Sequence, residues 1–142
     1  VNDRAILAAG AEAVGMMKTL YEVTLAYVKE RKQFNVPIGS FQVLQHRIVD
    51  MLIAYEDCKS ALLMASFADQ GGGAEAQRAA SGLKVKLAES GVNLAEQAIQ
   101  LHGAIGTTDE LNVGYYYKRL LMFAHLYGNT SHHLDRYCRL AQ

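Results

Sequence analysis

The chain has 142 residues, 51% of them hydrophobic, and a formal net charge of zero. This size corresponds to one domain with a substantial core, and a neutral chain has no electrostatic basis for nucleic-acid binding. No apolar run approaches the roughly 18 residues that a membrane-spanning helix needs. Two cysteines, Cys58 and Cys138, are too few for a disulfide framework and lack metal-ligand spacing. We therefore expect a cytoplasmic protein without a nucleic-acid partner, a membrane segment or a metal site.

The apolar residues recur at helical spacing through most of the chain. They predict five helices, over about residues 3–31, 40–70, 74–101, 111–126 and 131–141. Asn2 or Asp3 is expected to cap the first helix, Ser40 the second and Ser131 the last. No segment alternates over enough residues to predict a strand. Helices this long bury their apolar stripes only against one another, so we predict an all-α, antiparallel up-and-down four-helix bundle with a short extra C-terminal helix.

Small residues make the first helix thin between positions 8 and 15. A thin helix lets either a neighbouring helix or a ligand approach closely, and the sequence supports the two alternatives equally.

The corner between the first two helices is rich in polar and aromatic side chains. Arg31 offers a planar fork of donors suited to a phosphate, and Gln33 adds neutral donors. Phe34 and Phe41 offer apolar faces to a ring. A solvated helix end with favourable charge placement explains the same residues, and physical arguments alone favour that interpretation.

A glycine-rich turn follows the third helix, from His102 to Glu110, and with Gln100 and Leu101 it forms the run Gln100–Gly106. Small residues there would let a ligand approach the backbone amides, as in phosphate-binding loops. No strand precedes the turn, so it is not a dinucleotide fingerprint. A plain helix connection is the better supported interpretation of these residues alone.

Several short runs resemble the motifs of one family. Residues 31–35, Arg-Lys-Gln-Phe-Asn, are similar to Arg-x-x-Phe-Gly, and residues 41–45 match Phe-Gln-x-x-Gln. Residues 100–106 are similar to Gln-x-x-Gly-Gly-x-Gly, and residues 127–130 to Tyr-Glu-Gly-Thr. In these runs and in their order, the whole chain resembles the carboxy-terminal helical domain of the acyl-CoA dehydrogenases. The resemblance implies that residues 1–142 are part of a longer enzyme whose amino-terminal helical and middle β domains are absent here.

The resemblance also implies a function. Such enzymes use FAD to oxidise an acyl-CoA to its trans-2-enoyl-CoA, as in fatty acid β-oxidation. They pass electrons to an electron-transfer flavoprotein and usually form tetramers. Residues expected to contact the FAD of a neighbouring subunit are Arg31, Gln33, Phe34, Gln100, Gly103 and Ala104. Thr130 and His132 would lie along the FAD of the same or an adjoining site, Arg4 would contact CoA, and Tyr127 would border the thioester. Without the β domain, this chain alone is expected to be colourless and inactive.

The resemblance fails at the catalytic base. The family's usual glutamate position is Gly128 here, which carries no proton. A minority of the family places the base immediately before the CoA-contacting arginine, which implies Asp3. A helix cap or first-turn acid explains Asp3 equally well. The alternative for the intact protein is therefore a non-catalytic subunit or oligomerisation module of a mixed acyl-CoA dehydrogenase complex.

Overall fold

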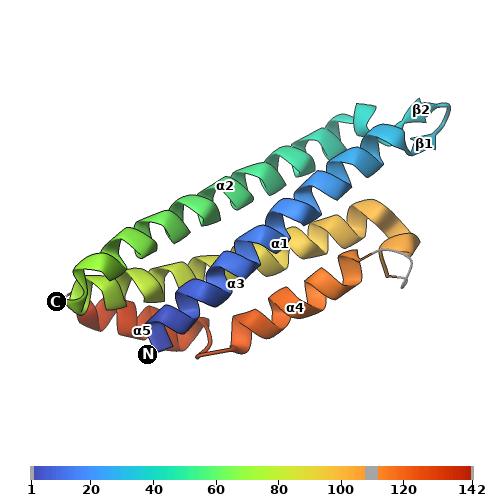
Figure 1. Ribbon diagram of the computed structural model, residues 1–142. Helices are drawn as coiled ribbons and strands as arrows, with labels where there is room; N and C mark the ends of the chain where they lie inside the picture. The colour runs from blue at the N-terminus through green and yellow to red at the C-terminus, as the bar shows by residue number, and fades with distance from the viewer. Residues whose placement is uncertain (1, 108–111, 142) are drawn as a thin grey trace.

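The computed structural model describes residues 2–107 and 112–141. Its helices are α1 (Asn2–Glu30), α2 (Gln42–Gly71), α3 (Gly73–His102), α4 (Val113–His125) and α5 (Thr130–Leu140). Two two-residue strands, β1 (Lys32–Gln33) and β2 (Val36–Pro37), and two 3₁₀ turns, Ile38–Ser40 and Gly103–Thr107, complete the elements. The expected four-helix bundle with an extra C-terminal helix is confirmed (Figure 1). Within the described ranges, no helix combines the length and apolarity needed to cross a bilayer.

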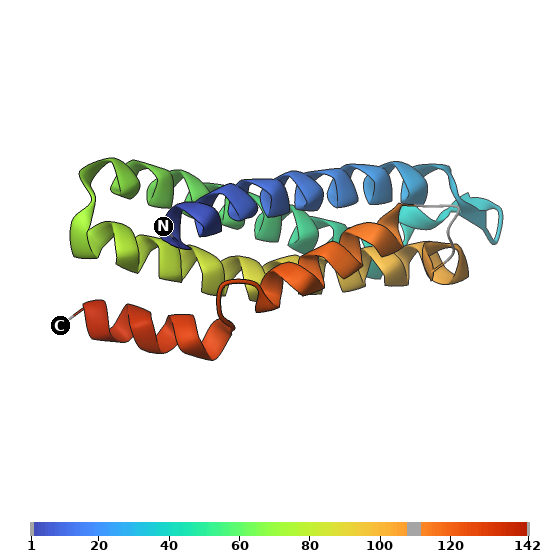
Figure 2. The same cartoon turned by 60° about the horizontal axis from the view of Figure 1, so that its bottom comes forward.

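Helix α3 is the centre of the bundle, because it contacts each of the other four helices. Helices α1 and α2 lie along its length, α4 lies beside its carboxy-terminal part and α5 beside its amino-terminal part (Figures 1 and 2). The start of α1 and the end of α5 share one end of the bundle, and the β1–β2 hairpin lies at the other. The two groups of candidate residues are therefore separated by the length of α1.

The core is formed by the facing apolar stripes of the helices. Its fully buried members include Met17, Leu20, Met51, Leu83, Leu87, Leu94 and Leu120. Gly10 lies in the thin part of α1, and a Cβ placed there would lie 3.1 Å from Leu87 Cδ1. At Gly10, close helix packing is therefore the alternative that the structure supports, whereas Gly15 faces open space.

The absence of strands was a wrong expectation. Lys32 pairs with Pro37 and Gln33 with Val36 in a short antiparallel ladder. The two residues between them, Phe34 and Asn35, have φ values of 53° and 64°. Positive φ at both central residues is typical of the type I′ turn, which matches the twist of a hairpin. Strands of two residues are too short to leave an alternating pattern, so the sequence did not reveal them.

The predicted caps at Ser40 and Ser131 were also wrong. Helix α2 begins at Gln42, and Ser40 Oγ instead donates to Pro37 O at 2.7 Å. Helix α5 begins one residue before Ser131, and Asn129 Oδ1 accepts from His132 N at 2.9 Å. At both corners the preceding turn shifts the helix start. Asp3 likewise lies inside α1, which starts at Asn2, and not at a cap position.

The chain must pass very close to α1 after the hairpin. A Cβ on Gly39 would lie 2.9 Å from Val28 O, a contact that real Cβ atoms essentially never make. We expect Gly39→Ala to lower the free energy of unfolding by about 1–3 kcal/mol, because backbone must move to admit the methyl group. The matched control is Gly15→Ala, where the space is open and helix propensity should add about 0.5–1 kcal/mol. Denaturant unfolding measures both; equal effects of the two substitutions would contradict the packing described.

Candidate functional site

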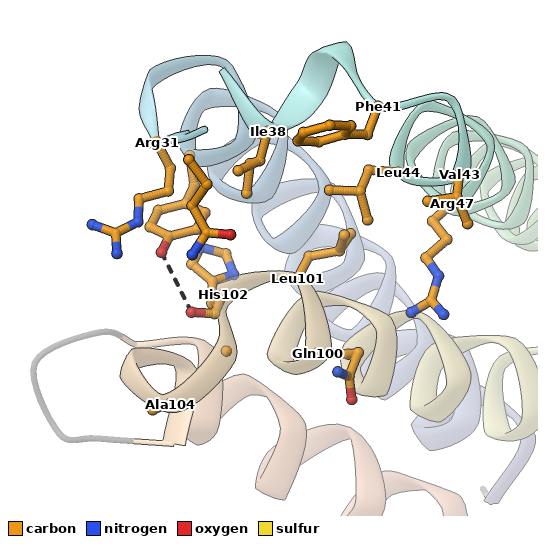
Figure 3. A pocket seen from close by; sticks show the side chains of 13 residues that line it. Arg31, Ile38, Phe41, Val43, Leu44, Arg47, Gln100, Leu101, His102 and Ala104 are labelled. Carbon is orange, nitrogen blue, oxygen red and sulfur yellow. Dashed lines mark hydrogen bonds between the residues drawn. The ribbon is translucent and has the colours of Figure 1, made fainter. Parts of the chain in front are cut away.

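A pocket of about 450 Å³ lies at the hairpin end of the bundle (Figure 3). Three segments that are far apart in the sequence form it: the end of α1 with the hairpin, the start of α2, and the end of α3 with its glycine turn. The residues that line it include Tyr27, Arg31, Gln33, Phe41, Arg47, Gln100, His102, Gly103 and Ala104. We call this the hairpin pocket. It brings together five of the six residues predicted to contact the FAD of a neighbour.

The hairpin pocket is electropositive. Its lining contains two guanidinium groups, from Arg31 and Arg47, and no carboxylate. Arg47 Nη1 donates to Gln97 Oε1 at 3.3 Å. Arg31 is exposed and has no carboxylate partner within the described part of the chain. A group with several negative oxygens would therefore find charge-assisted donors here.

Tyr27 and His102 form the floor of the hairpin pocket, and the sequence did not predict either of them. Their rings stack at 4.4 Å, and the Tyr27 hydroxyl donates to His102 O at 3.4 Å. The buried His102 ring donates from Nδ1 to Ala98 O at 2.8 Å. The available signal was spacing, because Tyr27 precedes Arg31 by one helical turn. The pair fixes the end of α1 against the end of α3.

Phe34 is the one predicted contact that lies outside the hairpin pocket. It occupies the turn of the hairpin, where its side chain is 87% exposed and meets the Phe41 ring edge-to-face at 6.4 Å. A bulky residue with φ of 53° is strained. The hairpin thus holds an aromatic ring in solvent at the expense of backbone strain.

A second pocket, of about 480 Å³, lies at the opposite end of the bundle. It is lined by Asn2, Asp3, Ile6, Tyr127, His132, His133 and Arg136. We call it the terminal pocket. It brings Asp3 beside the turn that contains Gly128, so the two positions at which the resemblance places a base flank one cavity.

Asp3 is held in an ion pair. Its carboxylate oxygens accept from Arg136 Nη1 and Nη2 at 2.5 and 3.0 Å. The hydrogen bonds from Arg136 lower the pKa of the Asp3 carboxyl, and they outweigh the opposing effect of burial. A carboxylate stabilised in this way is a weaker base.

The Tyr127–Gly128 turn is strained, and buried side chains donate hydrogen bonds to its carbonyl groups. Tyr127 and Gly128 have φ values of 59° and 105°. The ammonium of Lys84, which is fully buried, donates to Ala124 O and Gly128 O, each at 3.0 Å. His133 Nε2 donates to Tyr127 O at 2.8 Å. These buried donors determine the path of the chain between α4 and α5.

Gly128 leaves no room for a side chain. A Cβ there would lie 2.7 Å from His132 Cδ2 and 3.1 Å from His133 Nε2. The two histidine rings, T-shaped at 4.9 Å, therefore occupy the space into which a residue-128 side chain would extend. Of the two rings, His133 is buried at 1% exposed, whereas His132 is exposed.

Two other predicted residues lie near the terminal pocket but do not line it. Arg4 is largely exposed and pairs with Asp69 at 3.3 Å. Thr130 is the first residue of α5. In the described ranges, no cluster of three or more histidine, cysteine or acidic residues could hold a metal ion.

The comparisons with known proteins agree with this architecture. The family model "Acyl-CoA dehydrogenase, C-terminal domain" matches residues 3–139. The acyl-CoA dehydrogenase IpdE2 of Mycobacterium tuberculosis is 33% identical over 119 residues, which are 84% of this chain and 36% of that protein. The chain thus spans little more than a third of the length of this relative.

Solved structures are also similar. The structure of PigA with FAD and proline has a TM-score of 0.91 and 29% identity, covering 97% of this chain and 36% of that one. The ChsE4–ChsE5 complex from Mycobacterium tuberculosis has a TM-score of 0.92 and 25% identity, covering 99% and 38%. This chain belongs to the acyl-CoA dehydrogenase family, of which it represents the C-terminal domain.

Lys84 gives the domain a distinctive pH dependence. Burial lowers the pKa of its ammonium from 10.5 to about 8. The unfolded chain therefore binds more protons than the folded chain between pH 8 and 10.5, so we expect the free energy of unfolding to rise with pH in this range. Lys84→Met should remove the rise, whereas Lys86→Met, a control two residues along α3 that pairs with Asp57, should keep it. Urea titrations at several pH values provide the measurement; a rise that survives Lys84→Met would contradict this assignment.

Proposed function

We propose that this chain is the C-terminal domain of an FAD-dependent acyl-CoA dehydrogenase that oxidises an acyl-CoA to its trans-2-enoyl-CoA. In the intact protein the hairpin pocket contacts the FAD of a neighbouring subunit. The single observation that carries the proposal is the convergence of Arg31, Gln33 and the residues 100–104 in one electropositive pocket. The FAD that accompanies PigA, a protein with the same fold, supports this choice of cofactor.

The residues of the hairpin pocket suit a dinucleotide. Arg31 and Arg47 supply positive charge for a pyrophosphate, and Gln33 and Gln100 supply neutral donors and acceptors. Gly103 has φ of 64°, and nothing lies within 4 Å of a Cβ placed on it, so a ligand can approach its backbone. FAD bound there would supply the acceptor for a hydride. The residues of this chain would bind and orient it.

The separation of the two pockets supports a site shared between subunits. Helix α1 has 29 residues and is about 43 Å long. The hairpin pocket lies at its end and the terminal pocket at its start, a separation greater than the length of one dinucleotide. On this proposal each end serves a different FAD, so the hairpin reaches a neighbour while Tyr127, Thr130 and Arg4 serve the substrate and the FAD at the opposite end. One complete site then requires two chains, and a soluble flavoprotein takes up the electrons.

The family resemblance offers Asp3 as one candidate for the base. It lies in the terminal pocket beside the Tyr127–Gly128 turn, where a proton must be removed. To accept that proton it must first leave Arg136, with which it forms two hydrogen bonds. Its position supports the role, and its low pKa opposes it.

A second candidate function is an assembly module, and the outer face of α2 is the observation that supports it. Apolar side chains lie exposed on one side of this helix, within about 100° of one another at 100° per residue. We call them the α2 stripe: Val49, Ile53, Leu63, Met64 and Phe67. Exposed Glu56 and Ser60 divide the stripe, and its part around Leu63, Met64 and Phe67 is an exposed apolar surface of the kind that typically marks a protein–protein interface. The ChsE4–ChsE5 complex is a heteromeric relative of similar fold. The α2 stripe is compatible with either a homomeric or a mixed tetramer.

The cofactor proposal predicts a specific effect of Arg31→Ala in the intact protein. Loss of a charge-assisted hydrogen bond, about 1.5–3 kcal/mol, should weaken FAD binding about 10- to 150-fold. Lys29→Ala is the matched control, since Lys29 is a basic residue at the same helix end but outside the hairpin pocket. Equilibrium titration of flavin fluorescence measures both. Unchanged affinity in Arg31→Ala would count against the hairpin pocket as the FAD site.

The assembly role predicts that Phe67→Glu lowers the oligomeric state of the intact protein. Phe67 is 69% exposed in the isolated domain, and a buried glutamate at an interface would lack a partner. Val23→Glu on α1, which changes an exposed apolar residue outside the α2 stripe, is the control. Sedimentation velocity distinguishes the species. An unchanged oligomer in Phe67→Glu would exclude the α2 stripe as the interface.

A further inference from the structure

Among the described residues that line the terminal pocket, His132 has an imidazole suited to accept a proton and forms no hydrogen bond through either ring nitrogen. We propose that this side chain, His132, is the catalytic base of the chain, in place of both the missing carboxylate at Gly128 and the ion-paired Asp3. The inference deepens the proposed function and rests on it. It assigns to His132 a proton-transfer role instead of the flavin contact expected from the sequence.

The position of His132 is the first argument. Its Cδ2 lies 2.7 Å, and its Cγ 3.3 Å, from the place where a Cβ on Gly128 would be. The imidazole therefore starts where the side chain of the family's usual base would start. It lines the same cavity as Asp3 and Tyr127.

The ring nitrogens of His132 are available to accept a proton. Within residues 2–107 and 112–141, no hydrogen bond to either ring nitrogen of His132 is formed, and the side chain is exposed to the pocket. Its backbone N–H, by contrast, is fixed by Asn129 Oδ1 at 2.9 Å. The ring also meets His133 edge-on at 4.9 Å. A base needs this combination of a fixed main chain and an available lone pair.

Apart from the Tyr127 phenol, which in its neutral form is a proton donor rather than a base, the other titratable side chains that line the terminal pocket are already engaged. Both ring nitrogens of His133 are used: Nε2 donates to Tyr127 O, so Nδ1 accepts from Ser81 Oγ at 3.3 Å. Burial further lowers the pKa of His133. Asp3 and Arg136 bind one another, and the Lys84 ammonium faces two carbonyls. His132 is the imidazole left to act.

The proposed step is a simple proton transfer. The bond between the α-carbon of the acyl thioester and its hydrogen breaks, and the proton moves to a ring nitrogen of His132. The electron pair left on the α-carbon forms the double bond to the β-carbon as a hydride departs from that carbon to the oxidised flavin named in the proposed function. The imidazolium then returns its proton to solvent through the open pocket.

Proton removal can be measured without the hydride step. An acyl-CoA with a quaternary β-carbon has no β-hydrogen, so the intact flavin-loaded protein could only exchange its α-hydrogens with D₂O. We expect His132→Gln to slow this exchange at least about 100-fold, the range of general base catalysis. Acyl-CoA binding should remain within about threefold of wild type, because the His132 ring is exposed and its N-cap bond uses backbone. Imidazole added to His132→Ala should restore part of the exchange, which a purely structural role would not allow.

The controls separate the possible bases. His125→Gln changes an exposed histidine at the end of α4, outside the terminal pocket, and should exchange like wild type. Acyl-CoA should also protect His132, and not His125, from acylation by diethylpyrocarbonate, as read by mass spectrometry. Normal exchange in His132→Gln would overturn the proposal, and loss of exchange in Asp3→Asn alone would transfer the role to Asp3. Failure of the proposed function is distinguishable, since the wild-type protein itself would then bind no flavin or acyl-CoA.

Discussion

The buried ammonium of Lys84 is the constraint on which the terminal pocket depends. A charged group removed from water must be surrounded by acceptors. Among the described residues, Lys84 donates to Ala124 O and Gly128 O, and the Phe123 ring lies 4.8 Å from its nitrogen. The last turn of α4 and the residue that follows the Tyr127 bend must therefore remain against α3. The positive φ values of Tyr127 and Gly128 are maintained because these contacts define the path of the chain.

The same face of α3 also organises the start of α1. Ser81 lies three residues before Lys84, so the two side chains are neighbours on the helix. Ser81 Oγ accepts from Arg136 Nη1 at 3.2 Å and lies 3.3 Å from His133 Nδ1. Arg136 in turn holds Asp3. A continuous set of hydrogen bonds thus connects residue 3 with residue 127, which explains how the two alternative positions of a base come to flank one cavity.

The sequence predicted what depends on local pattern and motif. Helical periodicity and the glycine breaks gave the helices to within a few residues, and the motif at 31–34 and the turn at 100–104 do meet in one pocket. The sequence did not reveal the pairing of Asp3 with Arg136, because 133 positions separate the two residues and no local pattern links them. Lys84 did leave a signal, since it lies next to Leu83 within the buried stripe of α3, where a charge requires an explanation. The predicted glycine turn extends to residues that lie outside the described ranges.

The hairpin and the α2 stripe both expose large apolar side chains on the surface of the isolated domain. The β1–β2 turn holds Phe34 at positive φ with its ring almost fully in solvent, an arrangement that is unfavourable both in backbone energy and in apolar exposure. Within the described residues, Phe34 meets Phe41 edge-to-face and stays 87% exposed. Another surface that covered the hairpin would recover the apolar term and so offset the backbone strain. The terminal pocket differs, since its strained turn is compensated internally by Lys84 and His133. One end of α1 is therefore organised within the domain, while the hairpin at the other end leaves an aromatic ring exposed, as the proposed contact with a neighbour requires.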